Sequence, residues 1–432
     1  MPETSSFASR PGADRCPGVL RLAEAADGFL ARVRLPGGLA GATQLRALAR
    51  LAGELGDGRI ELTSRGNVQL RGLAADAAGP LTDGLDRAGL MPSLSHDRVR
   101  NVLASPLAGL DRGPSLTGIV RALDAALCAR PRLAELPGRF LFAVDDGRGD
   151  VAGLGADVVA QVRPGGAVVN GLCVRQADAP GKDVPAGSGP GAAPVIKVAR
   201  DADAVRAGSA DTDGMPDGLR DGIVAVSLAC AEAFLDLKAE LGGTAWRVAD
   251  LPGGPGRVRA LAAARLGLVA ATEELVAATE EAVATRAARP FGLVAGREAG
   301  GGSVVLIAPL GRLTAAQLSW VADRVAGRTA RITPWRSVVL PDLDDAAGVL
   351  REAAGLGFGT DEGSPWLRVT ACAGRPGCAS ALADVQADAA GFAARWPGRI
   401  MHVSGCARHC GRPAATEIDV TATSEGYEVA GV

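Results

Sequence analysis

The sequence predicts an α+β protein built around two copies of a β-α-β unit that pack about a pseudo-twofold axis. Two strand-helix-strand patterns support this, one in residues 28–73 and the other in residues 303–343. The chain has 432 residues, of which 47% are hydrophobic. This is enough for two or three domains, each with its own core.

The first copy begins with the alternating strand "FLARVRL", which ends in a Pro-Gly-Gly turn. A helix is expected next, because Leu45, Leu48 and Leu51 recur on one face. The stretch "IELTSRGNVQLRGL", residues 60–73, follows and is predicted to be a second strand.

The second copy repeats specific residues of the first as well as its pattern. The matches pair Pro36 with Pro309, Gly38 with Gly311, Gln44-Leu45 with Gln317-Leu318, and Thr63 with Thr333. Each unit alone is too small to bury its apolar face, so we expect the two to pack together. Where the first copy has Arg32, Arg34 and Arg65, the second has Val305, Ile307 and Trp335. We therefore expect the first copy to carry function and the second to be structural.

The region between the two copies contains mixed helix and strand signals at residues 85–175. Residues 176–218 are rich in Gly, Pro, Asp and Ala, which predicts a surface insertion with one short strand at Val195–Val198. Two helices are expected after it, "GIVAVSLACAEAFLDLKAEL" and "VRALAAARLGLVAATEELVAATEEAVATRAA". The Gly-rich "LPGGPGRVRAL", residues 251–261, follows no clear strand and is interpreted as a loop rather than a dinucleotide fingerprint.

Charge and hydropathy exclude some classes of function. The net charge of −2 argues against a general nucleic-acid-binding protein, which needs a basic excess. No stretch of about twenty apolar residues is present, so we expect no membrane span. The polar N-terminus lacks an apolar signal core and is interpreted as the frayed tail of a cytoplasmic protein.

Four cysteines near the C-terminus form two pairs, Cys372 with Cys378 and Cys406 with Cys410. Zinc modules usually separate the ligands of a pair by two to four residues, which suits only the second pair. Wider loops suit a [4Fe–4S] cube, and glycines flank both pairs. The spacing favours an iron–sulfur cluster, while zinc and unrelated thiols remain alternatives. His402 and His409 lie nearby as further candidate ligands, although such neighbours often only line a site.

This cysteine spacing, the repeated unit and the words "RVRLPGG" and "LTSRGNVQLRG" together resemble the sirohaem sulfite and nitrite reductases. The word "VRNVLASPLAGLD" is similar to the segment of that family that carries an active-site arginine. The resemblance runs from about Cys16 to Ala415. It implies two ferredoxin-like half-domains and two larger α/β domains, the C-terminal one carrying a [4Fe–4S] cluster. The expected boundaries are 1–15 for a disordered tail, 16–80 and 286–345 for the half-domains, and 81–285 and 346–432 for the larger domains.

The resemblance also implies roles for individual residues. Cys372, Cys378, Cys406 and Cys410 would hold the cluster, with the Cys410 thiolate facing the tetrapyrrole. The substrate-facing arginines would be Arg32 or Arg34 together with Arg100. Arg65 and Gln69 would help to seat the carboxylates of the macrocycle.

One segment departs from the reductases. Their short word with two lysines, which meet sulfite or nitrite, is replaced here by "LPGRFLFAVDDGRGD", where the lysine positions hold Arg139 and Leu141. Losing a cation beside a small anion removes charge that its reduction requires. The departure, with "RCPGVLRL" and "ITPWRSVVLPDL", resembles the precorrin-3B synthases, a subfamily of the same family.

The subfamily resemblance implies that precorrin-3A occupies the tetrapyrrole pocket as substrate, in place of sirohaem. Its eight carboxylates call for arginine forks. We expect Arg100 and Arg139 to be catalytic and Arg32, Arg34, Arg65, Gln69 and Arg336 to bind substrate. Three further arginines fit either the pocket or an ordinary solvated surface: Arg71, Arg98 and Arg148.

The reaction implied is an O₂-dependent monooxygenation of precorrin-3A with lactone formation, ahead of ring contraction in aerobic cobalamin biosynthesis. The subfamily is associated with a mononuclear non-haem iron, for which Asp145, Asp146, His402 and His409 are candidate ligands. Because no dinucleotide fingerprint stands out, electrons from NADH are expected through a separate donor. One alternative is a sirohaem-dependent nitrite or sulfite reductase. Another is a non-catalytic iron–sulfur electron carrier or tetrapyrrole-binding protein.

Overall fold

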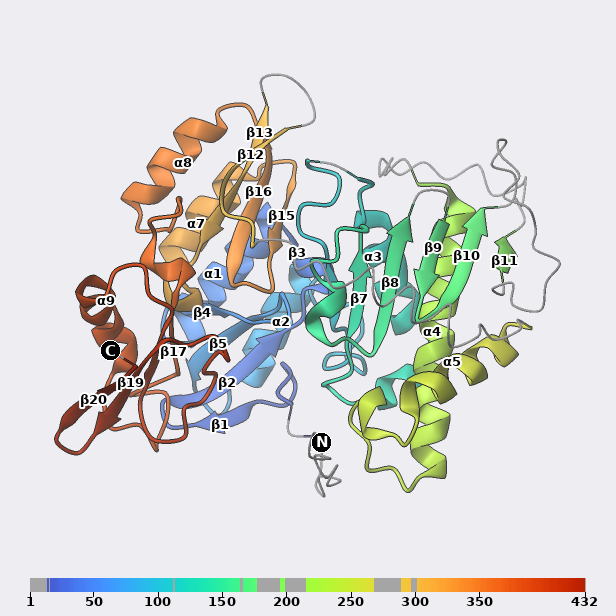
Figure 1. The fold of residues 1–432 in the computed structure, drawn as a ribbon, viewed down its shortest axis with the longest axis horizontal. Coiled ribbons are helices and arrows are strands. Elements are labelled where there is room, and N and C mark those ends of the chain that lie inside the picture. The colour runs from blue at the N-terminus through green and yellow to red at the C-terminus, as the bar shows by residue number, and fades with distance from the viewer. Residues whose placement is uncertain are drawn as a thin grey trace. The chain divides into compact units, whose positions relative to one another are not determined.

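A computed structural model describes residues 14, 16–111, 113–163, 166–176, 195–198, 215–267, 289–296 and 301–431 (Figure 1). They belong to two compact units. The repeat unit combines Pro17–Pro92 with Pro290–Val432, and the central unit combines Met1–Cys16 with Ser93–Arg289. The expected tail and most of the expected insertion at 176–218 lie outside the described residues. Within the described part of the chain, no helix has the length and apolar character needed to cross a membrane.

Two five-stranded sheets form most of the repeat unit. The first has the order β1 (Ala23–Ala25), β2 (Gly28–Val33), β5 (Val68–Leu73), β4 (Arg59–Leu62) and β14 (Arg312–Thr314). The second has the order β12 (Gly292–Ala295), β13 (Gly302–Ile307), β16 (Ser337–Leu343), β15 (Thr329–Ile332) and β3 (Leu39–Gly41). Each repeat contributes one strand to the sheet of the other repeat: β14 of the second repeat pairs with β4, and β3 of the first repeat pairs with β15. The expected pseudo-twofold pairing of the repeats is therefore confirmed.

Four helices complete the paired repeats: α1 (Ala42–Leu55), α2 (Ala78–Arg87), α7 (Ala315–Arg324) and α8 (Ala346–Gly355). Helices α1 and α7 pack against each other (Figure 1). Leu45, Leu48 and Leu51 of α1 are buried as their spacing predicts, in a single core shared with Leu318 and Val321 of α7. The shared core explains why neither repeat needs to be stable alone.

The residues that recur in the two repeats have equivalent contacts. Gln44 and Gln317 each reach back to a backbone amide at the start of their helix, accepting from Gly41 N and Thr314 N at 2.9 Å. The preceding turns, η1 (Pro36–Gly38) and η5 (Pro309–Gly311), each end in a glycine with a positive φ. A Cβ at Gly38 would collide with the carbonyl oxygen of Ile332 on β15, the strand that pairs with β3.

The interpretation of residues 60–73 as one strand is wrong. The segment is a hairpin of β4 and β5 around a turn at residues 63–67, in which Thr63 N donates to Asn67 O at 2.9 Å. The Thr63 hydroxyl accepts from the Asn67 amide at 3.2 Å and stabilises the turn. Thr333 does the same for Ser337 N at 3.3 Å in the second repeat.

The cysteine-bearing end of the chain, coloured red in Figure 1, forms a third sheet of the repeat unit. Its order is β17 (Val369–Ala371), β18 (Met401–Ser404), β19 (Ile418–Thr423) and β20 (Gly426–Ala430). The first three strands are parallel, and β20 is antiparallel to β19. Helix α9 (Val385–Arg395) packs on one face, where alternate strand residues such as Met401 and Val403 are buried. The 3₁₀ turn η6 (Pro365–Leu367) precedes this sheet.

The central unit contains a six-stranded mixed sheet. Its order is β11 (Val195–Val198), β10 (Leu172–Gln176), β9 (Gly166–Val169), β8 (Val158–Arg163), β7 (Phe142–Asp145) and β6 (Val102–Ala104). The short strand expected at Val195–Val198 is confirmed. Its described helices are α3 (Thr117–Cys128), α4 (Asp217–Glu240) and α5 (Gly254–Arg265), with 3₁₀ turns η2 (Pro131–Glu135), η3 (Ala152–Leu154) and η4 (Val248–Asp250).

Helix α4 packs along β8, β9 and β10 and corresponds to the first of the two expected helices. The interpretation of residues 251–261 as a loop is wrong, because α5 begins at Gly254. The turn before it holds Gly253 at a φ of 61° and follows η4, not a strand. Residues 268–288, the rest of the second expected helix, lie outside the described part of the chain.

Candidate functional site

Both cysteine pairs begin at the same edge of the third sheet. Strands β17 and β18 are parallel neighbours with Ala371 opposite Val403, so their carboxyl ends meet at one edge. Cys372 directly follows β17, and its amide donates to Val403 O at 3.0 Å. The amide of Gly405, which precedes Cys406, lies 3.1 Å from the Cys372 sulfur.

The two cysteine loops also contact each other. Leu382 N donates to Gly405 O at 2.7 Å, and a Cβ at Gly405 would lie only 2.7 Å from Ala381 Cβ. Cys372, Cys378 and Cys406 are half-buried, while Cys410 is exposed. The two loops that carry the four cysteines thus contact each other at one edge of the sheet, and four thiolates are the donor set that a [4Fe–4S] cluster requires.

The distances between the thiols can be compared with those expected for a zinc site. A tetrahedral site with Zn–S bonds of about 2.3 Å places its sulfurs roughly 3.8 Å apart. No three of these thiols lie within 4.8 Å of one another. The four thiols of these described loops therefore do not form a preassembled tetrahedral zinc site.

A row of three polar residues crosses the sheet on the face opposite α9. Thr370, His402 and Asp419 stand opposite one another on β17, β18 and β19. Asp419 binds the second cysteine loop, because His409 Nδ1 and Arg412 Nε lie 3.1 and 2.9 Å from its Oδ2. His409 and Arg412 flank Cys410, so the Asp419 carboxylate ties the loop to the sheet. The imidazole of His409 is thereby engaged by a carboxylate.

His402 lies beneath the same loop and is 1% exposed. Burial lowers the pKa of its imidazole to about 4, so the ring is neutral at physiological pH. Its Nδ1 lies 2.8 Å from Thr370 Oγ1, and the ring is also hydrogen-bonded to the backbone of Cys410. The buried imidazole therefore connects β17 to the second cysteine loop.

A second polar row crosses the first sheet of the repeat unit, on the face opposite its core. Arg32, Gln69, Glu61 and Arg312 are in register on β2, β5, β4 and β14. Arg32 Nη2 donates to Gln69 Oε1 at 3.2 Å, and Gln69 Nε2 donates to Glu61 Oε2 at 2.9 Å. Arg312 Nε donates to Glu61 Oε1 at 2.9 Å. We call these four residues the polar row of the first sheet.

Arg71 connects this sheet face to the first cysteine loop. Its Nε and Nη2 bind the Asp27 carboxylate in bidentate fashion at 2.9 Å, and Nη2 also donates to Gly377 O at 2.7 Å. Gly377 immediately precedes Cys378. Arg71 is buried in these contacts and is therefore not a solvated surface arginine.

The other arginines expected to bind substrate in this unit have different environments. Arg34 is 2% exposed, and its Nη2 lies 3.3 Å from the backbone oxygen of Pro17. Arg65 is half-buried in the turn between β4 and β5, and Arg336 is half-buried at a φ of 60°. The corresponding face of the second sheet is apolar, since Val305 and Ile307 are buried where the first repeat has Arg32 and Arg34.

The two arginines expected to be catalytic both lie in the central unit. Arg100 is buried, and its Nε and Nη2 bind the Asp124 carboxylate at 2.7 Å each. Arg139 is exposed at the start of the segment that precedes β7. Leu141 is 3% exposed in an apolar cluster with Leu103, Ala143 and Val151. Position 141 therefore holds a buried apolar side chain where the reductases have a lysine.

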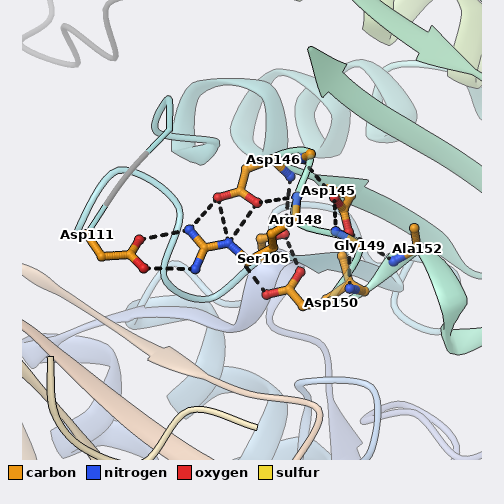
Figure 2. A network of polar contacts seen from close by, with 10 residues as sticks. Ser105, Asp111, Asp145, Asp146, Arg148, Gly149, Asp150 and Ala152 are labelled. Carbon is orange, nitrogen blue, oxygen red and sulfur yellow. Dashed lines mark hydrogen bonds and ion pairs between the residues drawn. The ribbon is translucent and has the colours of Figure 1, made fainter. Parts of the chain in front are cut away.

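Arg98 and Arg148 both form ion pairs within the central unit. Arg98 lies 3.2 Å from Asp14. Figure 2 shows Arg148 between two carboxylates, with Nη2 at 2.8 Å from Asp111 and 2.6 Å from Asp146. The Arg148 side chain is only 7% exposed, so it is a buried structural cation rather than a solvated one.

The acidic residues around Arg148 were candidates for iron ligation. The carboxylates of Asp145, Asp146 and Asp150 lie within 4.8 Å of one another, the one such cluster of His, Cys, Asp or Glu in the described residues. However, four backbone amides already bind Asp145, two on each carboxylate oxygen, and Arg148 binds Asp146 (Figure 2). No histidine joins the cluster, so these residues lend no support to the expected non-haem iron.

Asp150 is the unusual member of this acidic loop. It is 8% exposed and accepts a hydrogen bond from Ser105 Oγ at 2.5 Å. Burial, together with the charges of Asp145 and Asp146, raises the pKa of Asp150 to about 7. The carboxyl group therefore changes protonation near neutral pH.

Comparison with known proteins agrees with this architecture. Residues 22–88 match the family model described as the nitrite/sulfite reductase ferredoxin-like half domain. The solved structure of Mycobacterium tuberculosis NirA superposes with a TM-score of 0.65 at 18% identity, covering 93% of this chain and 73% of NirA. The chain has the nitrite/sulfite reductase fold.

Two curated relatives show how far the sequence similarity extends. A ferredoxin–nitrite reductase of Synechococcus elongatus is 36% identical over 128 residues, which is 28% of this chain and 25% of that protein. A precorrin-3B synthase of a Sinorhizobium species is 28% identical over 430 residues, covering 95% of this chain and 81% of the relative. The resemblance to the precorrin-3B synthases inferred from sequence motifs is therefore confirmed over nearly the whole chain.

Sequence reasoning missed four residues of these polar rows: Glu61, Arg312, Thr370 and Asp419. Arg312 follows the repeated Pro-x-Gly turn, but its contact with Glu61 exists only because β14 crosses to the other sheet. The alternation of "RIEL" and "IDVTAT" places Glu61 and Asp419 on polar strand faces, which was the available signal.

Proposed function

We propose that this chain is a precorrin-3B synthase, an oxidoreductase that hydroxylates precorrin-3A with dioxygen and closes a lactone. The observation that carries the proposal is the similarity to a precorrin-3B synthase over 95% of the chain. The match to the Synechococcus nitrite reductase spans only 28% of the chain. The buried Leu141, in place of an anion-binding cation, favours the same conclusion.

The residues proposed to hold a [4Fe–4S] cluster are Cys372, Cys378, Cys406 and Cys410. Their two loops share one sheet edge, and Arg71 and Asp419 hold the loops from either side. When bound, such a cluster supplies electrons singly, which dioxygen requires to react with a closed-shell organic molecule.

The polar row of the first sheet is proposed to bind substrate carboxylates. Arg32 is half-buried, and its guanidinium is oriented by Gln69, which Glu61 orients in turn. A guanidinium held in this orientation is suited to bidentate recognition of a carboxylate. Arg65 lies in the turn that joins β4 and β5 of this sheet and is proposed to extend the same surface.

The small-anion chemistry of nitrite or sulfite reduction is disfavoured by the surroundings of position 141. The backbone of Leu141 is held by Asp157, whose Oδ2 accepts from Leu141 N at 2.9 Å. The side chain is buried among aliphatic neighbours, where an isolated ammonium would be strongly destabilised.

The proposed reaction consumes precorrin-3A, O₂, two electrons and two protons. One oxygen atom forms the hydroxyl at the meso carbon between rings A and D, and the other leaves as water. The double bond between that meso carbon and the neighbouring ring carbon is consumed: a carboxylate oxygen of the ring A acetate bonds the ring carbon and closes the lactone, and the proton of the acid is released. We propose that the two electrons come from NADH through a separate donor protein. Arg100 and Arg139 are proposed to act in this reaction, Arg139 through its exposed guanidinium.

The test is turnover of precorrin-3A by the full chain after anaerobic cluster reconstitution, with a chemical reductant and ¹⁸O₂. We expect a product heavier than the substrate by one labelled oxygen atom. Incorporation of oxygen from water, or no conversion by a chain that contains iron and sulfide, would contradict the proposal.

A sirohaem-dependent nitrite or sulfite reductase is the second candidate, favoured by the half-domain match at residues 22–88. It predicts one extractable sirohaem per chain and the corresponding absorption bands. A non-catalytic iron–sulfur carrier or tetrapyrrole-binding protein would bind precorrin-3A without converting it. The absorption spectrum and the turnover assay thus separate the three functions.

A further inference from the structure

A pocket of about 380 Å³ lies in the central unit, against one face of β8 and β9. Gln161 of β8 stands opposite Val168 of β9, so the two side chains share that face of the sheet. The other walls come from η3, η4 and the start of α5, through Ala152, Val248 and Pro255. This volume is near the lower end of the range for ligand pockets, so it suits one small organic molecule rather than a tetrapyrrole.

The wall formed by η4 is attached to the sheet by Asp157, which is 6% exposed. Its Oδ1 accepts from Val248 N at 2.8 Å, and its Oδ2 accepts from Arg247 Nε at 2.6 Å and from Leu141 N at 2.9 Å. Arg247 Nη2 also donates to Gly155 O. Both oxygens of the carboxylate are therefore engaged, and the wall that carries Arg247 is held in place by the protein itself.

Gln161 brings an amide donor to this pocket. The residue lines the pocket and is 7% exposed. Its Oε1 accepts from Arg163 Nη2 at 3.2 Å, which distinguishes the oxygen of the amide from its nitrogen. No residue in the described part of the chain accepts a hydrogen bond from Gln161 Nε2. An acceptor atom on a bound molecule would complete the hydrogen bonding of this buried amide.

Arg259 brings a cation to the same pocket. It is half-buried on α5 and lines the pocket, and it forms no ion pair with the described residues. Arg257 of the same helix, in contrast, lies 3.3 Å from the Glu240 carboxylate. Pro255 is in the first turn of α5, where the helix dipole adds partial positive charge. Since Asp157 is the one acidic residue among the described lining and is paired with Arg247, the pocket favours an anion.

The rest of the lining is mainly aliphatic. Its apolar members are Ala152, Ala156, Val159, Val168, Val248 and Ala249. An inorganic anion would leave this surface in contact with water, whereas the apolar body of an organic anion would bury it. The lining therefore selects a molecule that is charged at one end and apolar elsewhere.

We propose that this pocket binds a small organic carboxylate. Its apolar body lies against β8 and β9, its carboxylate is bound by Arg259, and Gln161 Nε2 donates a hydrogen bond to one of its oxygens. The inference goes beyond the proposed function, because none of the residues proposed to bind precorrin-3A or the cluster lines this pocket.

The first test is calorimetric titration of the full chain with three probes: naphthalene-2-carboxylate, its neutral amide and inorganic phosphate. We expect the carboxylate to bind at one site per chain, and the amide to bind at least about tenfold more weakly because it lacks the charge. Phosphate should show no measurable binding. No binding of the carboxylate, equal affinity of the carboxylate and its amide, or binding of phosphate would overturn the proposal.

The second test locates the site with variants whose folding is checked by thermal unfolding. Arg259→Ala should weaken binding of naphthalene-2-carboxylate about tenfold, because it removes a charge-assisted hydrogen bond. Arg259→Lys should recover part of the loss, since it keeps the charge but not the planar fork. Val159→Phe fills the pocket and should abolish binding. Arg257→Ala, on the same helix but outside the lining, is the matched control and should bind as wild type does.

Wild-type affinity in Arg259→Ala or in Val159→Phe would place the carboxylate elsewhere and overturn the proposal. An equal loss in Arg257→Ala and Arg259→Ala would assign the effect to general surface charge and would also overturn it. Because binding is measured without substrate turnover, either result leaves the proposed function untouched.

Discussion

Arg71 Nη2 donates a 2.7 Å hydrogen bond to the carbonyl oxygen of Gly377, which links the first repeat to the loop between Cys372 and Cys378. The same guanidinium binds Asp27 in bidentate fashion, and both side chains are largely buried. The contact is so close that a Cβ at Gly377 would lie 2.8 Å from Arg71 Nη2. The geometry of the first cysteine loop therefore depends on the sheet of the first repeat.

Arg71→Leu should destabilise the chain and weaken cluster retention. Removing one partner of a buried ion pair leaves the Asp27 carboxylate unpaired, which typically costs about 3–5 kcal/mol. Denaturant unfolding and iron content measure the two effects. The double variant Arg71→Leu/Asp27→Leu should be less destabilised than Arg71→Leu. Equal stability of Arg71→Leu and wild type would show that the pair is not formed.

Serine at any of the four C-terminal cysteine positions should abolish most of the iron bound after reconstitution. Each thiolate supplies one of four ligands, and a hydroxyl is a poor replacement. Cys128→Ser, a half-buried cysteine of α3 in the central unit, is the control that should keep its iron. Full iron and sulfide content in Cys406→Ser would remove that residue from the ligand set.

Arg32→Ala should weaken precorrin-3A binding about tenfold, or about 1.4 kcal/mol, because it removes one charged carboxylate contact. Arg32→Lys should recover only part of the loss, since a point charge cannot bind in bidentate fashion. Anaerobic titration of the substrate's absorption measures both. Arg46→Ala removes an exposed arginine of α1 paired with Asp323 and should leave binding unchanged. Wild-type affinity in Arg32→Ala would rule out the polar row as the binding surface.

Leu141→Lys tests whether the anion site can be restored. We expect a destabilised chain without nitrite or sulfite reduction, because the ammonium would enter an apolar cluster. The expected loss in the free energy of unfolding is at least about 3 kcal/mol. A stable variant that reduces nitrite would show that position 141 faces an anion site after all.

Asp150 should make stability depend on pH near neutrality. Its folded pKa of about 7 lies above the ordinary value of 3.8, so the folded state keeps a proton that the unfolded state releases between these values. This contribution to stability is complete below about pH 4 and is lost as pH rises toward 7, at no more than about 1.4 kcal/mol per pH unit.

Asp150→Asn keeps a polar partner for Ser105 and removes the titration. Its melting temperature relative to wild type should therefore be higher at pH 8 than at pH 5. Asp221→Asn, at an exposed position of α4, is the control and should show no such difference. A wild-type pH profile in Asp150→Asn would mean that another group titrates.

The repeat and the cysteine constellation could be predicted from sequence because their signals are local. The capping glutamines at 44 and 317 and the turn threonines at 63 and 333 act within a few residues of themselves. Such short-range contacts need the same residue types wherever the unit occurs. The prediction of one continuous strand at residues 60–73 was wrong for a reason that is also local. Thr63 closes a turn in the middle of an alternating pattern.

The partners of the charged side chains could not be predicted in this way. Arg312 and Glu61 are 251 residues apart in sequence, and Arg71 and Gly377 are 306 apart. The register of an exchanged strand brings the first two together, and the packing of a loop on a sheet brings the others. Arg100 looked like a free catalytic cation in sequence, but Asp124 binds its guanidinium from the next helix.

The pseudo-twofold repeat, the spacing of the four cysteines and the leucine at position 141 are visible in the amino-acid sequence. These features depend on residue type, order and short-range geometry. Folding, in contrast, establishes which arginines are bound by carboxylates, which imidazole is buried beneath Cys410, and which strands cross between the repeats. A charged or polar group takes its role from the partner and the burial that folding gives it, and neither can be predicted from the residues adjacent to it in the sequence.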